Sequence, residues 1–168
     1  MITQRLLNAD DIIVHGLSAG EDGQPELAFC TPEIAQDFAL AALQTGQVYV
    51  CDEDRFAMEA LAALLRDALD RGVLTPADLM GTEPAVIARL RADAVSGPAW
   101  DRFRRFHTIR TAAGERPEGG FWVRVNAKRR WIDPLAVGRG RVSAWSPAFR
   151  EARTSFLSLD FTRWLSAE

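Results

Sequence analysis

The sequence is poor in the residues from which proteins build metal and redox centres. Its 168 residues include two cysteines and two histidines. Cys30 and Cys51 lie too far apart for a CxxC motif, so neither a zinc site nor a redox pair is indicated. We interpret both as buried thiols, with a disulfide or a nucleophile as the alternatives. His15 and His107 belong to no HxxxH, HxH or HD motif, so we expect no metal site and no cofactor.

Long hydrophobic runs and common nucleotide motifs are also missing. No window approaches the roughly 20 apolar residues that a membrane helix needs, and the N-terminal residues do not resemble a signal peptide. We therefore expect a cytoplasmic protein with no membrane contact. The sequence contains no GxxxxGK[ST], GxGxxG or GxSxG motif. We predict no catalytic residues for the chain by itself, with His107 as a general base the alternative.

The composition predicts one globular domain spanning residues 1–168, since 48% of the residues are hydrophobic and 26% charged. Its helical part covers about residues 31–110. Thr31 and Pro32 form a typical helix start, and we expect that helix to end near Thr45, before Gly46. Apolar residues at helical spacing predict a second helix over 52–71, capped by Asp52. Shorter helices follow from residues 75 and 82, and an amphipathic helix over 99–110.

Two regions show strand patterns. Short apolar runs at residues 11–17 and 26–29, separated by turn formers, predict an N-terminal β-hairpin. From residue 121 the apolar residues alternate, and strands over 121–126, 130–137 and 141–145 make a basic β part over about 121–145. The apolar residues near the C-terminus predict a docked tail or short helix. The fold class is therefore α+β, mostly helical, with an N-terminal β-hairpin and a small antiparallel sheet in the C-terminal half.

Charge is unevenly distributed along the chain. The net charge is −3, but residues 1–98 carry −10 and residues 99–168 carry +7. The basic β part concentrates cations beside two tryptophans, Trp122 and Trp131, that are candidates for stacking on a base. The candidate phosphate ligands are Arg124, Lys128, Arg129, Arg130, Arg139 and Arg141. Two other interpretations stay open: these cations guard an edge strand, or they face the acidic half of the chain.

Three stretches resemble the region that follows the catalytic core of bacterial HD-domain metal-dependent phosphohydrolases. The first begins at Asp11 and continues through ELAFCTPEIAQDFALAALQTGQVYVCDEDRFAMEALAALLRDALDRGVLTPADLM. The second and third are TEPAVIARLRAD and KRRWIDPLAVGRGRVSAWSPAFR. Members of that family use histidines and aspartates to bind a divalent metal, and these elements have no counterpart here. The resemblance therefore transfers no catalytic residue and no metal ligand.

The resemblance implies a noncatalytic accessory domain of an enzyme that acts on nucleotides or phosphate esters. Such a domain covers an active site as a lid, mediates oligomerisation, or adds basic residues for substrate phosphate. The implied partners are a catalytic HD-domain polypeptide, a second copy of the chain, or a phosphate-bearing ligand, with residues 128–141 as the contact surface. The alternative is a small nucleic-acid or nucleotide-binding module that uses the same basic hairpin.

Overall fold

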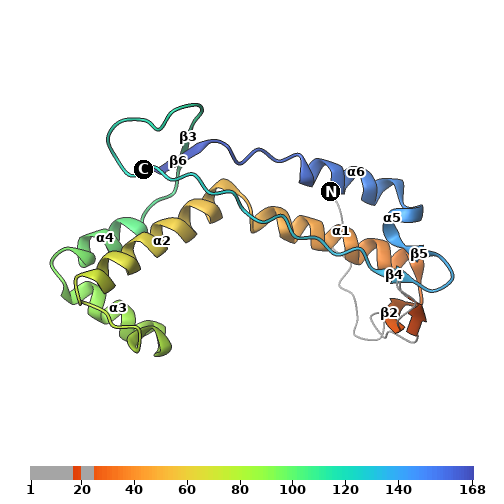
Figure 1. The fold of residues 1–168 in the computed structure, drawn as a ribbon, viewed down its shortest axis with the longest axis horizontal. Coiled ribbons are helices and arrows are strands. Elements are labelled where there is room, and N and C mark those ends of the chain that lie inside the picture. The colour runs from red at the N-terminus through yellow and green to blue at the C-terminus, as the bar shows by residue number, and fades with distance from the viewer. Residues whose placement is uncertain (1–16, 20–24) are drawn as a thin grey trace. The chain divides into compact units, whose positions relative to one another are not determined.

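The computed structural model describes residues 17–19 and 25–168, so most of the strand predicted over 11–17 lies outside the described residues. The fold is α+β and mostly helical, as predicted (Figure 1). The chain forms two compact units. Unit 1 contains the described residues up to Tyr49 together with Lys128–Leu159, and unit 2 contains Val50–Ala127 and Asp160–Glu168. Within the described ranges, no helix has the length and apolar character needed to cross a bilayer.

Unit 1 contains a four-stranded mixed sheet in the order β1-β2-β4-β5. The predicted hairpin is confirmed, because Leu17 of β1 pairs with Leu27 of β2 in antiparallel register. The later pair β4 and β5 is also antiparallel, but β4 joins the hairpin by pairing parallel to β2. The four strands are β1 (Leu17–Ala19), β2 (Pro25–Phe29), β4 (Leu135–Ala136) and β5 (Gly140–Arg141).

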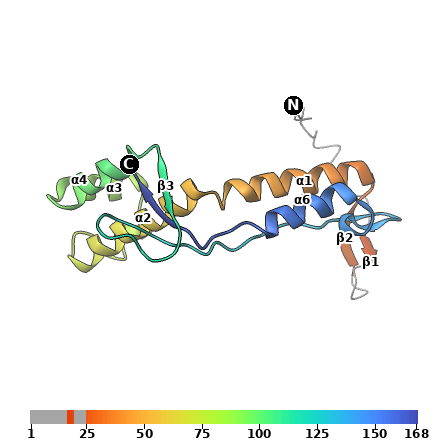
Figure 2. The same cartoon turned by 90° about the horizontal axis from the view of Figure 1, so that it is seen from above.

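Two helices pack side by side in unit 1, as both views show (Figures 1 and 2). Helix α1 (Pro32–Val48) starts at the predicted Thr-Pro signal and buries Ala35, Ala39 and Leu43, which lie four residues apart on one face. Helix α6 (Pro147–Leu157) buries Phe149 and Phe156. Because two of the α1 residues are alanines, the large rings of α6 fit between the helices without opening them.

Gly46 lies inside α1, although the sequence predicted that the helix would end before it. A Cβ atom at this position would lie 3.2 Å from the Arg130 carbonyl oxygen and 3.3 Å from the Phe156 ring. The glycine therefore provides space for a neighbouring segment, and it does not terminate the helix. The helix continues through Gly46 to Val48. The close approach of Arg130 and Phe156, and not the end of a helix, explains why this position is a glycine.

Unit 2 is built on helix α2 (Asp52–Asp70), whose first residue is the one that the sequence suggested as its cap. The cap is Cys51, whose Sγ accepts a hydrogen bond of 3.4 Å from the Asp54 amide. Helix α2 packs against α4, and α4 packs against α3. Their shared core buries Leu64, Ala68, Leu74, Leu90 and Trp100. The remaining helical elements are η2 (Asp78–Met80), α3 (Glu83–Ala92) and α4 (Ser96–Phe103).

Asp93 joins α3 to α4. Its carboxylate accepts hydrogen bonds of 3.2 and 2.7 Å from the Val95 and Ser96 amides and pairs with Arg71 at 2.9 Å. These contacts, the Ser96 amide first, lower the pKa of Asp93 to about 2. Helix α3 therefore ends at Ala92, and the contacts of Asp93 let α4 start at Ser96.

A two-stranded antiparallel sheet closes unit 2. Strand β3 (Ile109–Ala112) pairs with β6 (Trp164–Ala167), and Val123 forms an isolated bridge with Leu165. The docked tail predicted for the C-terminus is confirmed, since Leu165 is fully buried. This pairing also explains why the helix predicted over 99–110 is shorter than expected. Helix α4 ends at Phe103, and the chain then turns into β3, which pairs with β6.

All three predicted strands of the basic β part were wrong in extent or in type. The strand over 121–126 is reduced to the isolated bridge at Val123. The strand over 130–137 is reduced to β4. The strand over 141–145 is the helical turn α5 (Val142–Trp145). The Asp133 side chain accepts a 2.9 Å hydrogen bond from the Ser143 amide, and the Pro134 carbonyl accepts one of 3.1 Å from Val142. These bonds curl the chain at a point where local periodicity indicates extended backbone.

Candidate functional site

The six predicted phosphate ligands have different surroundings. Arg141 forms a bidentate ion pair with Glu26, with N–O distances of 2.6 and 2.7 Å, and donates a third bond of 3.0 Å to the Asp133 carbonyl. Its charge is therefore matched by a carboxylate that lies 115 residues earlier in the sequence. Arg139 follows β4, and its guanidinium lies 5.4 Å from the centre of the Trp145 ring.

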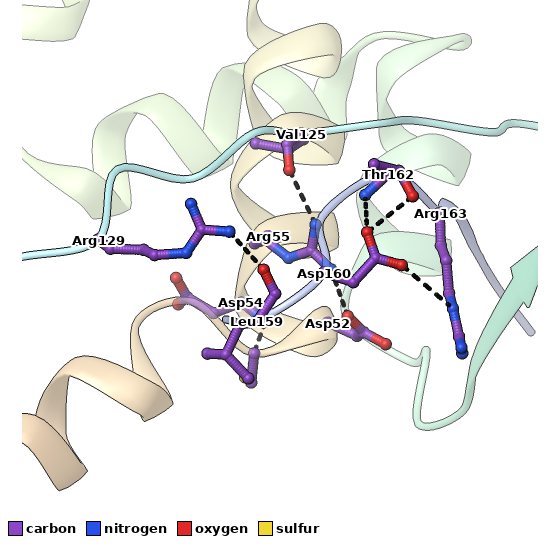
Figure 3. A network of polar contacts seen from close by, with 10 residues as sticks. Asp52, Asp54, Arg55, Val125, Arg129, Leu159, Asp160, Thr162 and Arg163 are labelled. Atoms are coloured by element: carbon purple, nitrogen blue, oxygen red, sulfur yellow. Dashed lines mark hydrogen bonds and ion pairs between the residues drawn. The ribbon is translucent and has the colours of Figure 1, made fainter. Parts of the chain in front are cut away.

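Three further predicted residues also contact parts of their own unit. In unit 1, Arg129 is half-buried and donates a hydrogen bond to the Leu159 carbonyl (Figure 3). In unit 2, the Arg124 guanidinium lies 4.7 Å from the centre of the Trp164 ring. Trp122, predicted to stack on a base, is half-buried, and the Arg110 guanidinium lies 5.5 Å from its ring centre. The cation–π contacts of Arg124 and Arg110 stabilise the surface of unit 2.

The remaining predicted residues are exposed and lie close together in the sequence of unit 1. Lys128 and Arg130 are exposed and have no ion-pair partner within the described part of the chain. Trp131 is 42% exposed and Ile132 is 49% exposed. Arg129, which lies between these two cations, is half-buried. We call Lys128, Arg130, Trp131 and Ile132 the contact stripe.

A buried arginine holds unit 2 together. Arg55 of α2 is 3% exposed, and it pairs with Asp52 and donates a 2.8 Å hydrogen bond to the Val125 carbonyl (Figure 3). Its guanidinium lies 4.5 Å from the centre of the Phe161 ring. Arg55 therefore links α2 to two segments far away in sequence. With these partners, Arg55 has a structural role. Its charge alone did not distinguish it from the arginines that were candidates for binding phosphate.

Asp160 organises the turn beside this arginine. Its carboxylate accepts hydrogen bonds of 2.8 and 2.7 Å from the Thr162 amide and hydroxyl (Figure 3). The Thr162 hydroxyl and amide lower the pKa of Asp160, and the charges of Arg163 and Arg55 act in the same direction. The carboxylate is thus ionised at neutral pH and fixes the turn that leads into β6.

An apolar pocket of about 950 Å³ lies within unit 2. Four phenylalanines line the pocket, and we call them its floor. The centre of the Phe56 ring lies 5.2 Å from that of Phe106 and 6.0 Å from that of Phe121, and Phe103 lies 6.0 Å from Phe106. Phe103 and Phe106 lie within the segment predicted as an amphipathic helix, but no sequence pattern indicated the pocket. Phe56 comes more than 40 residues before the other three phenylalanines, so local periodicity does not connect them.

Charged residues surround the pocket, and most of the acidic ones are neutralised within the protein. Asp67 lies 2.8 Å from Arg71, and Glu168 lies 2.7 Å from Arg110. Arg102 also lines the pocket, is exposed, and has no ion-pair partner in the described ranges. An apolar body with few polar groups at its edge is the usual construction of a small-molecule site.

His107 also lines this pocket. Its backbone amide donates a 3.4 Å hydrogen bond to the Glu168 carbonyl, and its Nδ1 lies 3.0 Å from the Arg105 carbonyl. A carbonyl accepts but does not donate, so Nδ1 carries the proton and Nε2 is left as an acceptor in the neutral ring. His107 therefore lines a cavity, but among the described residues no carboxylate bonds to its ring as in a catalytic dyad or triad.

The cysteines and acidic residues do not assemble a metal centre within the described ranges, where no group of three or more potential ligands lies together. The expectation that both thiols are buried was wrong for Cys30, which is exposed. Cys51 is half-buried at the start of α2. Burial, the largest cause, raises the pKa of the Cys51 thiol, so it is the less reactive thiol form at neutral pH.

Comparison of the chain with protein-family models, curated proteins and solved structures finds no match to any of them.

Proposed function

We propose that the chain is a noncatalytic accessory domain that binds a cytoplasmic catalytic phosphohydrolase polypeptide of the HD type through the contact stripe. The observation that carries the proposal is the stripe itself. Trp131 and Ile132 are 42% and 49% exposed beside the exposed cations Lys128 and Arg130. Apolar and aromatic side chains bordered by unpaired charge are characteristic of a protein interface.

The charge of the stripe selects the kind of partner surface. Lys128 and Arg130 have no acidic neighbour in the described ranges that would neutralise them, unlike Arg141, which is paired with Glu26. An acidic partner surface complements these two cations and accelerates association. The resemblance to the region that follows the catalytic core of HD-domain phosphohydrolases suggests the partner, and the contact stripe suggests where the partner binds.

A second candidate function is the binding of a nucleotide or a single-stranded nucleic acid. Trp131 favours it, because a half-exposed indole next to Lys128 and Arg130 can stack on a base while the cations contact phosphate. Of the six cations predicted for this role, Arg141 is already paired with Glu26, and Arg129 is bonded to the chain itself. The smaller set of available cations favours the protein partner.

The test is a calorimetric titration of the purified chain with the HD-type catalytic polypeptide from the same genome. We expect saturable binding that weakens as salt rises, because the interface is partly ionic. The double variant Lys128→Glu/Arg130→Glu should bind at least about tenfold more weakly, since it places like charges against an acidic surface. The matched control is Arg91→Glu/Arg104→Glu, which reverses two exposed arginines of unit 2 and should bind like the wild type.

Three results would decide against this proposal. A double variant that binds as tightly as the wild type removes the contact stripe from the interface. Self-association without any interaction with the polypeptide replaces the partner by a second copy of the chain. Nucleotide or oligonucleotide binding that falls with salt and is lost in the double variant supports the second candidate instead.

A further inference from the structure

We propose that the pocket of unit 2 is a binding site for a small, ring-bearing organic monoanion. The pocket is independent of the contact stripe, because all of its lining residues belong to unit 2. Its volume of about 950 Å³ is within the range of roughly 300–1,000 Å³ that small-molecule sites occupy. We infer the ligand from the phenylalanines and the charged residues that line the pocket.

The phenylalanine floor favours a flat apolar ligand. Phe56 meets Phe106 at an interplanar angle of 77° and Phe121 at 76°, so ring edges and ring faces are both presented. Phe121 is 45% exposed, which leaves ring surface for a ligand. Aromatic rings pack on one another in edge-to-face and offset arrangements, and such pairs contribute beyond the burial of area alone. An aromatic ligand therefore matches the floor better than a flexible chain does.

The charged residues that line the pocket favour a ligand with a single negative charge. Asp67 and Glu168 are each paired with an arginine, at 2.8 and 2.7 Å, and Asp101 lies 3.8 Å from Arg105. Arg102 remains as a cation without an ion-pair partner in the described part of the chain. One guanidinium matches one carboxylate or sulfonate. A nucleoside di- or triphosphate brings several charges toward three carboxylates and is disfavoured here.

The experiment compares the binding of two ligands of the same shape to the purified 168-residue chain at low ionic strength. The probes are 1-naphthylacetate and its neutral amide, 1-naphthylacetamide, measured by calorimetry or ligand-observed NMR. Both should bind, and the acetate about fivefold more tightly, which is the size of an exposed ion pair. Arg102→Gln should make the two affinities equal. Arg104→Gln removes an exposed neighbouring arginine that does not line the pocket and should preserve the difference.

A second pair of variants tests the location. Ala63 lines the pocket from α2, and Ala63→Trp should fill it and abolish the binding of both probes. Met58→Trp adds an indole to the same helix at an exposed position outside the pocket and should change neither affinity. If Ala63→Trp does not fold, Pro98→Trp fills the pocket from an exposed position. The proposal is overturned if the wild type binds neither probe or binds both equally, or if a folded filling variant still binds the acetate.

Discussion

Arg55→Ala should lower the free energy of unfolding of unit 2 by about 2–4 kcal/mol, the sum of a lost buried hydrogen bond, ion pair and cation–π contact. The Val125 carbonyl loses its 2.8 Å donor, and Phe161 loses the guanidinium at 4.5 Å. The Asp52 side chain is 42% exposed, so water solvates it after the change and keeps the cost below that of a fully buried pair. Urea denaturation gives the total, and amide exchange at Val123 and Leu165 reports on unit 2 directly.

The control for this prediction lies on the same helix. Arg66 is 60% exposed and pairs with Glu59 at 2.6 Å, so Arg66→Ala should change stability by no more than about 0.5 kcal/mol. Arg55→Lys retains the charge but not the planar fork, and it should fall between the wild type and Arg55→Ala. Equal stability of the Arg55→Ala and Arg66→Ala variants would show that the buried arginine does not join the segments of unit 2.

Gly46→Leu should destabilise unit 1 by about 1–3 kcal/mol through overpacking. The new side chain begins 3.2 Å from the Arg130 carbonyl and 3.3 Å from the Phe156 ring, and the ring belongs to a buried residue that has little room to move. Leucine is a better helix former than glycine by up to about 1 kcal/mol, so the observed loss is what remains after this gain. Denaturation gives the loss, and the indole NMR signal of Trp131 should shift as the adjoining segment moves.

Gln47→Leu adds the same side chain one residue later, at an exposed position of α1. It should leave both stability and the Trp131 signal close to those of the wild type, since the side chain at this position is exposed. A Gly46→Leu protein that is more stable than the wild type would mean that helix propensity, and not the contact with Arg130 and Phe156, governs this position.

The helix starts were the part of the fold that the sequence predicted best. The Thr-Pro start of α1 and the acidic first turn of α2 appear where expected, because the fixed backbone angle of Pro32 and the helix dipole act only on neighbours in the chain. The Thr31 side chain itself makes no capping hydrogen bond. The same local logic was available at Ser146, where the side chain accepts a 3.1 Å bond from the Phe149 amide and starts α6. Its Ser-Pro sequence was the signal for a helix that the periodicity alone did not indicate.

The errors arise where distant residues decide the local conformation. The segment after Phe103 leaves the helix because β3 pairs with β6, which lies more than 50 residues later. Residues 142–145 coil because Asp133 caps them from ten residues away. Sequence periodicity describes one segment at a time, so it contains no information about such partners.

The predicted site shows the same limit. The sequence identified the cluster of cations, but the pairing of Arg141 with Glu26 and the bond from Arg129 to Leu159 depend on the fold. Lys128 and Arg130 look the same as these residues in the sequence and differ only in lacking a partner in the described ranges. The pocket was missed for a related reason, because Phe56 and Phe121 come together only after folding.

The most direct test of the account is a phosphohydrolase assay of the purified chain with nucleotides and phosphate esters in the presence of Mg²⁺ or Mn²⁺. His107 lines a pocket, but the described residues provide neither a carboxylate bonded to its ring nor a cluster of metal ligands. The account predicts no hydrolysis above the buffer rate by the chain alone. Hydrolysis that is lost in His107→Ala, in a variant that still folds, would contradict it and make the chain an enzyme.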